Sequence, residues 1–284
     1  MCIRDSNNTI EEKRNNKRTF ILFGIGGSYK PNENIEIYSN ISENYRSVTF
    51  ADISIINPAF SINPDISDER GNTIDLGIRG NINKLISYDL TLFNLNYKDR
   101  IGFAQKEFKD GSVKSERGNI GDAIIYGLES NIDFDVNNLI IKNDNISLNV
   151  FLNTAIIDSE YIRSEENGVI GKKVEFVPNY NIKTGIKLGI GNFIFNTQYS
   201  HVSTQFTDSS NAKEGNISGI IGEIPGYSLL DFSIAYRLKK IKIETGINNL
   251  TNTYYFTRRA TGYPGPGIIP SPPRNTYITL QIRL

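Results

Sequence analysis

Cysteine and histidine are almost absent from this chain, whose 284 residues include one of each, Cys2 and His201. A single cysteine excludes a disulfide framework and a cysteine-based metal site within the chain. A single histidine leaves almost no room for a histidine-rich metal centre or a Ser–His–Asp triad, and no other nucleophile–base pair stands out. We therefore expect a protein that is not an enzyme and that holds no metal or cofactor of its own.

Net charge and long apolar runs are missing as well. The 31 basic and 31 acidic side chains give a formal net charge of zero, so no global field attracts nucleic acid, and we expect no nucleic-acid partner. The absence of any run of about 18 apolar residues excludes a transmembrane helix. The residues after Met1 are too polar for a signal peptide. We expect residues 1–6 (MCIRDS) to be a non-native scar, and an N-terminal portion to be missing if the protein is exported.

What the sequence does contain is alternation of apolar and polar residues with a period of two, which predicts β-strands. The alternation is clearest near the C-terminus, where the apolar set of residues 241–247 and 278–284 is interleaved with a polar set that includes Arg237, Lys242, Glu244 and Arg283. A small soluble barrel fills its interior with the apolar face, whereas a membrane barrel turns that face to lipid. The alternation alone leaves both arrangements open.

Connection lengths distinguish the two arrangements. The period predicts eleven strands, over residues 19–30, 35–46, 73–82, 88–104, 124–136, 146–156, 180–190, 193–206, 230–238, 241–248 and 277–284, and a slip in the alternation near residues 92–93 indicates a bulge. Short turns alternate with long polar loops, which include residues 47–70, 105–118, 158–173 and 207–222. This alternation is typical of outer-membrane barrels. We therefore predict an all-β, antiparallel transmembrane barrel whose apolar face meets lipid and whose polar face lines the lumen.

Several segments also resemble a known family. INNLTNTYYFTRRATGYPGPGI (247–268) and PRNTYITLQIRL (273–284) look like the C-terminal end of TonB-dependent outer-membrane receptors. YSNISENYRSVTFADI (38–53), DERGNTIDLGIRG (68–80) and GNIGDAIIYGLESNIDF (118–134) match the family in the same order. YFTRRATGYPGPGIIPSPPR (255–274) is most similar to the ferric-citrate receptor branch.

The resemblance implies a fold and partners beyond this chain. Family members combine an N-terminal plug with a barrel of about 22 strands. Residues 7–284 would then form the C-terminal half of such a barrel, about 11 strands, with the plug missing. The plug would contact the TonB–ExbB–ExbD complex, and the barrel would lie in outer-membrane lipid and lipopolysaccharide. An open half-barrel leaves two unpaired edges, so we expect this segment alone not to be transport-competent.

Arg258 and Arg259 are the candidate ligand-binding residues, because they enter a Gly/Pro-rich loop at the outer end of a strand. A guanidinium stays charged and binds carboxylates bidentately, which suits a ferric chelate such as ferric citrate as the transported ligand. Both arginines would otherwise line a wet lumen or pair with a neighbouring acid. Another siderophore, cobalamin or an oligosaccharide remain alternative cargoes. A passive porin-like barrel and a soluble β-sandwich remain alternative classes.

Overall fold

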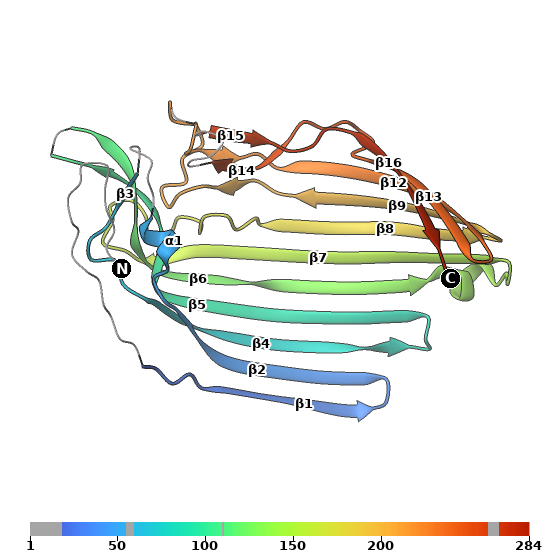
Figure 1. Ribbon diagram of the computed structural model, residues 1–284. Helices are drawn as coiled ribbons and strands as arrows, with labels where there is room; N and C mark the ends of the chain where they lie inside the picture. Colours follow the sequence, from blue (N-terminus) through green and yellow to red (C-terminus); the bar gives the residue numbers. More distant parts are fainter. Residues whose placement is uncertain (1–18, 55–59, 110, 218, 261–266, 284) are drawn as a thin grey trace.

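The computed structural model describes residues 19–54, 60–109, 111–217, 219–260 and 267–283, and the predicted scar at residues 1–6 lies outside them. Its main feature is one antiparallel sheet in which strands that follow one another along the chain are hydrogen-bonded neighbours (Figure 1). In sheet order the strands are β1 (Gly24–Asn32), β2 (Ile35–Arg46), β4 (Glu69–Ile82), β5 (Ile86–Glu107), β6 (Val113–Asp135), β7 (Ile146–Arg163), β8 (Tyr180–Ile190), β9 (Phe193–Val202), β12 (Tyr227–Leu238), β13 (Ile241–Asn248) and β16 (Asn275–Ile282). These eleven strands confirm the predicted strand number and order. Within the described ranges, β1 and β16 are the two edges of the sheet.

The two faces of the sheet differ in character, as the alternation predicts. Register places four apolar side chains in one row across four strands: Leu76, Leu92, Leu128 and Ile156. This is the apolar face; Leu92 is 56% exposed on it, and Ile243, Leu280 and Ile282 of the last strands are also exposed. A polar row lies on the opposite face, which we call the polar face: Asp89, Thr91, Glu129, Asn131, Asn153 and Lys183.

Connections of two lengths lie at the two ends of the strands (Figure 1). Residues 33–34, 83–85, 191–192 and 239–240 are tight turns, and residues 136–145 include the π-helical turn η1 (Asn137–Ile141). Residues 47–68, 164–179, 203–226 and 249–274 are long connections at the other end, which we call the loop end. None of the helices in the described ranges is long and apolar enough to cross a membrane.

The structure differs from the sequence prediction at several boundaries: β1 begins at Gly24, β4 begins at Glu69 and β9 ends at Val202. Residues 105–118, predicted as a polar loop, continue β5 and β6 as a two-stranded ribbon that pairs up to Glu107 and Val113. Lys106 and Glu116 form a 2.8 Å ion pair across this ribbon. Cross-strand pairs of opposite charge stabilise strands, so a polar segment can continue the sheet. β7 likewise extends to Arg163. Register is regular at residues 92–93, and the irregularities lie on either side of Arg100 instead.

The long connections carry small elements that the sequence pattern did not reveal. They are the helix α1 (Phe50–Ile53), the strand β3 (Phe60–Ile62), and the strand pairs β10 (Gln205–Phe206) with β11 (Glu223–Ile224) and β14 (Phe256–Ala260) with β15 (Gly267–Pro270). β3 pairs in parallel with β6. The loop end is therefore a folded layer attached to the long strands.

Candidate functional site

Two long connections meet strand β5 at the loop end in a small apolar cluster. Phe60 of β3 packs edge-on against Phe103 of β5, with ring centroids 5.5 Å apart. Ile220 and Ile221 of the connection 203–226 complete the cluster and are almost fully buried. Ser209 donates from its backbone N and its Oγ to the Phe103 carbonyl, both at 3.1 Å. This cluster holds the 47–68 and 203–226 connections together over the β5–β6 ribbon.

A second apolar cluster forms where the connection 164–179 folds over the polar face. Its Val169 and Val174 side chains cover Tyr161, Ala123 and Ile125. Ala123, Ile125 and Tyr161 share a face with the polar row, because each lies an even number of positions along its strand from a member of that row. Near the loop end, this face of the sheet therefore carries apolar side chains, and the connection 164–179 covers them.

A cavity of about 510 Å³ opens beside the second cluster, which contributes Ile125 to its wall. Three arginines from three different strands line it: Arg46 at the end of β2, Arg100 of β5 and Arg117 of β6. The remaining wall is formed by Glu69, Tyr97, Ile101, Ile125, Glu175, Phe176 and Val177. Phe176 has φ +61°, a left-handed conformation that is strained for an aromatic residue and that marks functional sites more often than other positions.

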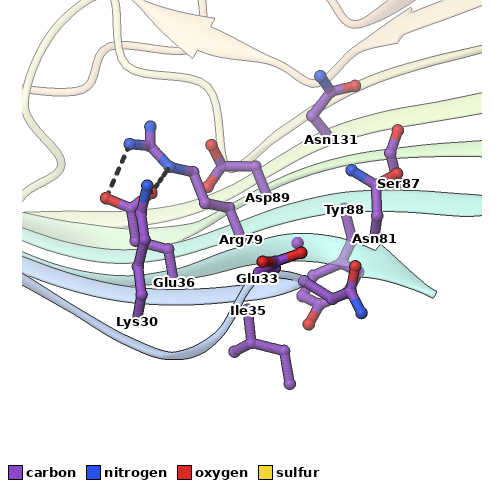
Figure 2. A pocket seen from close by; sticks show the side chains of 12 residues that line it. Lys30, Glu33, Ile35, Glu36, Arg79, Asn81, Ser87, Tyr88, Asp89 and Asn131 are labelled. Atoms are coloured by element: carbon purple, nitrogen blue, oxygen red, sulfur yellow. Dashed lines mark hydrogen bonds and ion pairs between the residues drawn. The ribbon is translucent and has the colours of Figure 1, made fainter. Parts of the chain in front are cut away.

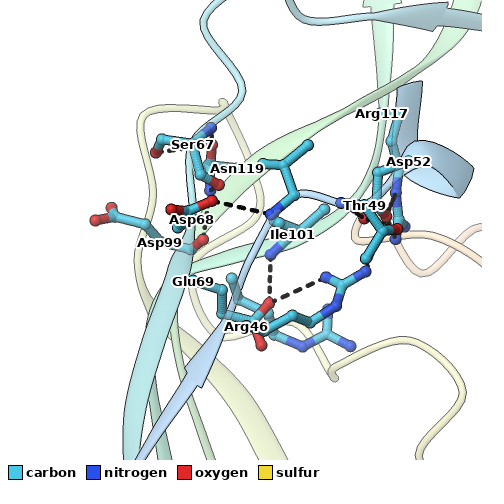
Figure 3. Close-up of polar contacts among 12 residues, drawn as sticks. Arg46, Thr49, Asp52, Ser67, Asp68, Glu69, Asp99, Ile101, Arg117 and Asn119 are labelled. Carbon is cyan, nitrogen blue, oxygen red and sulfur yellow. Dashed lines mark hydrogen bonds and ion pairs between the residues drawn. The ribbon is translucent and has the colours of Figure 1, made fainter. Parts of the chain in front are cut away.

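Arg46 and Arg117 share one carboxylate (Figure 3). Asp52 Oδ1 accepts from Arg46 Nη2 at 2.8 Å and from Arg117 Nη2 at 2.7 Å. Burial on its own would raise the pKa of Asp52, but hydrogen bonds from Arg117 and Thr49 outweigh it and hold that pKa well below its usual range. Asp52 therefore stays ionised throughout the neutral and mildly acidic range.

Arg100 has its own buried partner. Its Nη1 lies 2.9 Å from Glu175 Oε1 and 2.8 Å from the Tyr161 hydroxyl, which donates to Glu175 Oε2 at 2.6 Å. A Cβ at Gly102 would collide with Glu175 Oε1, so glycine is needed where the carboxylate approaches β5. The group Arg100–Tyr161–Glu175 ties the infolded connection 164–179 to the sheet.

The arginines around the cavity are more exposed than the acids that pair with them. The three arginines balance Asp52, Glu69 and Glu175 in number, but the acids are the more deeply buried partners: Arg46 has 38% of its side chain exposed, against 4% for Asp52. A solute entering the cavity therefore meets guanidinium donors before it meets carboxylates. No group of three or more His, Cys, Asp or Glu side chains that could hold a metal ion occurs in the described part of the chain. The cavity is suited to an anionic or oxygen-rich ligand rather than to a bare cation.

The two arginines predicted from the sequence lie elsewhere at the loop end, in β14, and on opposite faces of it. Arg258 is exposed. Arg259 is turned inward: its Nη1 and Nη2 donate to the carbonyls of Gly219 and Glu223, both at 2.9 Å, and its guanidinium lies 5.3 Å from the Phe256 ring centroid. Burial lowers the pKa of Arg259, and the charge of Glu223 opposes this shift. Arg259 thus links the β14–β15 hairpin to the connection 203–226, and the ligand-binding role of both residues stays a prediction.

A second, smaller cavity of about 330 Å³ lies at the opposite end of the strands, near the tight turns (Figure 2). Arg79 donates to Glu36 from Nε at 3.2 Å and from Nη2 at 3.1 Å, and Lys30 Nζ lies 3.7 Å from the same carboxylate. The Arg79 guanidinium also lies 5.2 Å from the Tyr38 ring centroid. These charges satisfy one another, so this cavity offers a ligand less than the arginine-lined cavity does.

Comparison with known proteins identifies the architecture. Residues 4–250 match the family model described as TonB dependent receptor-like, beta-barrel. The chain belongs to this family. Members of the TonB-dependent receptor family are outer-membrane transporters and receptors of Gram-negative bacteria and not enzymes, and they work with TonB.

Solved structures of TonB-dependent receptors share the fold. The unliganded ferric citrate transporter FecA is 22% identical, with a TM-score of 0.72 over 92% of this chain and 38% of its own. The copper transporter OprC is 14% identical, with a TM-score of 0.67 over 91% of this chain and 38% of its own. The ferric yersiniabactin uptake receptor FyuA from Yersinia pestis is 17% identical, with a TM-score of 0.66 over 91% and 36%. The chain thus spans a little over a third of the length of these receptors, and its sheet is a partial barrel of their type.

The sequence contained a usable signal for part of the arginine-lined cavity. Arg46 closes the predicted strand 35–46 before a long loop, which is the position that singled out Arg258. Arg117 fell in the predicted loop 105–118, and Glu69 fell in the predicted loop 47–70, where we expected a solvated carboxylate. Their convergence depends on β3 pairing with β6, a contact between segments more than 50 residues apart. Nothing in the local pattern indicates that contact.

Proposed function

We propose that this chain forms part of an outer-membrane, TonB-dependent receptor that takes up a ferric chelate, with ferric citrate as the first candidate. The observation that carries the proposal is the cavity at the loop end, where three guanidinium groups are more exposed than the acids that balance them. Carboxylates are bound by such groups through charge-assisted and bidentate hydrogen bonds. Recognition of this kind needs no covalent chemistry.

The direction of transport follows from the proposed orientation. The loop end faces the outside, the tight turns face the periplasm, and the apolar face meets lipid and lipopolysaccharide. Energy for uptake comes from TonB with ExbB and ExbD, acting through a plug. The ferric chelate is cargo, and the protein keeps no metal of its own.

A chelate that carries an aromatic ring is the second candidate, because Phe176 lines the same cavity. This ring is about half exposed, and its backbone conformation is one that an aromatic residue adopts only at a cost of about 1–3 kcal/mol. Such a strained, exposed ring suits stacking on a planar ligand. Citrate has no ring that could stack on Phe176.

Uptake of radiolabelled ferric citrate by cells that produce the receptor carrying this chain tests the proposal. Arg100→Gln and Arg117→Gln should each weaken uptake by about tenfold or more, because each removes a charged donor worth about 1.5–3 kcal/mol. Arg163→Gln is the matched control, since Arg163 pairs with Asp99 and Asp122 on an exposed surface outside the cavity. Equal uptake by all three variants would remove the cavity from the transport path.

The same assay tests whether Arg258 and Arg259, the two arginines predicted from the sequence, contact the ligand. In the Arg258→Ala/Arg259→Ala variant we expect uptake to fall if these residues contact ligand. The single Arg258→Ala variant separates contact from structure, because Arg258 is exposed whereas Arg259 supports the connection 203–226. Unchanged uptake in both variants would exclude the pair from the site.

A further inference from the structure

The two carboxylate oxygens of Asp52 accept hydrogen bonds from different groups. Oδ2 accepts from the backbone N of Thr49 at 2.9 Å and from its Oγ1 at 2.7 Å, which closes the N-terminal turn of α1. Oδ1 accepts from Arg46 Nη2 at 2.8 Å and from Arg117 Nη2 and Nε at 2.7 and 3.2 Å. Asp52 is only 3% exposed, so its carboxylate is shielded from solvent. One oxygen thus orients two guanidiniums from two strands (Figure 3).

The segment that carries Asp52 is fixed to the strand that carries Arg117. β3 pairs in parallel with residues 115–117 of β6, and the Asn63 backbone N donates to the Arg117 carbonyl at 2.9 Å. The Arg117 guanidinium also lies 4.6 Å from the Phe103 ring centroid, within cation–π distance. Asp52 thus contacts Arg117 of β6 directly, and Arg46 of β2 contacts the same carboxylate oxygen.

Each arginine keeps donors for a ligand after these contacts. Among the contacts of the described residues, Arg117 Nη1 has no partner, and Arg46 Nη1 lies 3.6 Å from Glu69, beyond hydrogen-bond length. Glu69 Oε2 is already engaged by the Ile101 backbone N at 2.8 Å. Both guanidiniums line the cavity, and together with Asp52 and Glu69 they form a unit of two positive and two negative charges.

We propose that Asp52 is a positioning residue that holds Arg46 and Arg117 as a two-arginine clamp for a carboxylate group of the bound chelate. The inference rests on the proposed function and extends it to specific residues. Arginine side chains carry about 2 kcal/mol of rotamer entropy each, and two of them repel one another when they converge. Asp52 offsets both costs before a ligand arrives, which is the general effect of preorganisation on affinity.

Modification of arginine by phenylglyoxal, read residue by residue by mass spectrometry on outer membranes containing the receptor, tests the clamp. Free citrate is the probe, so the outcome does not depend on iron transport. Citrate should slow the modification of Arg46 and Arg117 several-fold and leave Arg163 unaffected, since Arg163 lies outside the cavity. If citrate protects neither Arg46 nor Arg117, the clamp is wrong even where ferric citrate is taken up. If uptake is absent but protection is seen, the proposed transport function fails and the clamp stands.

The role of Asp52 is tested by variants in the same assay. Asp52→Asn keeps the side-chain shape and removes the charge, and protection should then require about tenfold more citrate. Thr49→Val is the matched control, because it removes the hydroxyl bond to Oδ2 and leaves the arginine contacts intact. Protection in Asp52→Asn at the wild-type citrate concentration would overturn the positioning role, and so would tighter protection.

A double-mutant cycle separates positioning from a general structural effect. In the Arg46→Gln/Arg117→Gln background, citrate binding is measured by the protection that remains at Arg100. Asp52→Asn should cause no further loss there, because Asp52 acts through the two arginines. An equal additional loss in this background would mean that Asp52 only stabilises the fold. Asp52→Glu should restore part of the protection lost in Asp52→Asn.

Discussion

At the scale of single residues, two buried carboxylates at the loop end differ in how completely their oxygens are hydrogen-bonded. Glu175 is bound by Arg100 and the Tyr161 hydroxyl. Asp208 is 1% exposed, and its Oδ2 has no hydrogen-bond partner among the described residues, while its Oδ1 is bound by Ser210. Burial raises the pKa of Asp208, although the Ser210 hydrogen bonds oppose this shift. Ionised Asp208 therefore destabilises the connection 203–226 at neutral pH.

Asp208→Asn should stabilise the connection 203–226 at pH 7 by about 1 kcal/mol, since an amide carries no charge to desolvate. The folded-state pKa of Asp208 is raised, so its favourable contribution is complete below the unfolded pKa of about 3.9 and is lost as pH rises through the folded pKa. The advantage of asparagine should therefore shrink as pH falls toward about 4. Hydrogen exchange of peptides covering residues 205–224, at both pH values, measures the difference.

Asp144→Asn is the control for Asp208→Asn, because Asp144 lies exposed in a turn at the opposite end of the strands. Its exchange should match the wild type at both pH values. Faster exchange of residues 205–224 in Asp208→Asn at pH 7 would show that the carboxylate has a partner that stabilises its charge.

At the scale of elements, the infolded connection 164–179 contains one buried, ion-paired carboxylate and one strained residue. Glu175 is buried against Arg100, and the next residue, Phe176, has φ +61°. The Phe176 backbone N donates to the Phe206 carbonyl at 2.9 Å, so the connection 203–226 helps to hold the strained conformation. The ion pair and this bond help to keep the connection over the polar face, alongside backbone bonds between Tyr161 and residues 171–172, and the connection forms one wall of the arginine-lined cavity.

Glu175→Gln should release this connection, because it leaves the Arg100 charge buried without a counter-charge, at a cost of about 3–5 kcal/mol. Hydrogen exchange at residues 171–177 should accelerate about a hundredfold or more, while exchange in the middle of β5 and β6 stays slow. Glu166→Gln is the control, since Glu166 makes only a 3.5 Å contact with the partly exposed Lys106 and should change exchange little. Unchanged protection of residues 171–177 in Glu175→Gln would mean that the apolar contacts of Val169 and Val174 suffice.

The elements also divide into those that the sequence predicts and those that it does not. The eleven long strands were predicted because each has its own period-two pattern, as in residues 73–82 and 180–190. The folding of the long connections was not predicted, because it depends on contacts such as Phe60 with Ile220 that join distant segments. The arginine-lined cavity is built from those contacts. Its residues were visible in the sequence as separate charges, and their convergence was not.

At the scale of the whole molecule, the two faces of the sheet set its environment. The apolar face presents an uninterrupted row from Leu76 to Ile156 across four strands, while the polar face carries charge along its middle. A soluble sandwich would bury the apolar row against a second layer. In the described part of the chain, members of this row such as Leu92 remain more than half exposed. This pattern fits a barrel wall with lipid on one side and a polar interior on the other.

Leu92→Arg and Asn131→Arg place the same charge on the two faces and so test this orientation. Leu92→Arg should cost about 2–4 kcal/mol of folding free energy in lipid vesicles, the penalty for arginine at the bilayer midplane on the lipid face. Asn131→Arg should cost little, because its side chain faces the polar row directly opposite Asp89. The heat-dependent shift in gel mobility of the receptor measures the folded fraction in a urea series. A smaller loss for Leu92→Arg than for Asn131→Arg would reverse the assignment of the faces, since a charge is tolerated only where water or a counter-charge can reach it.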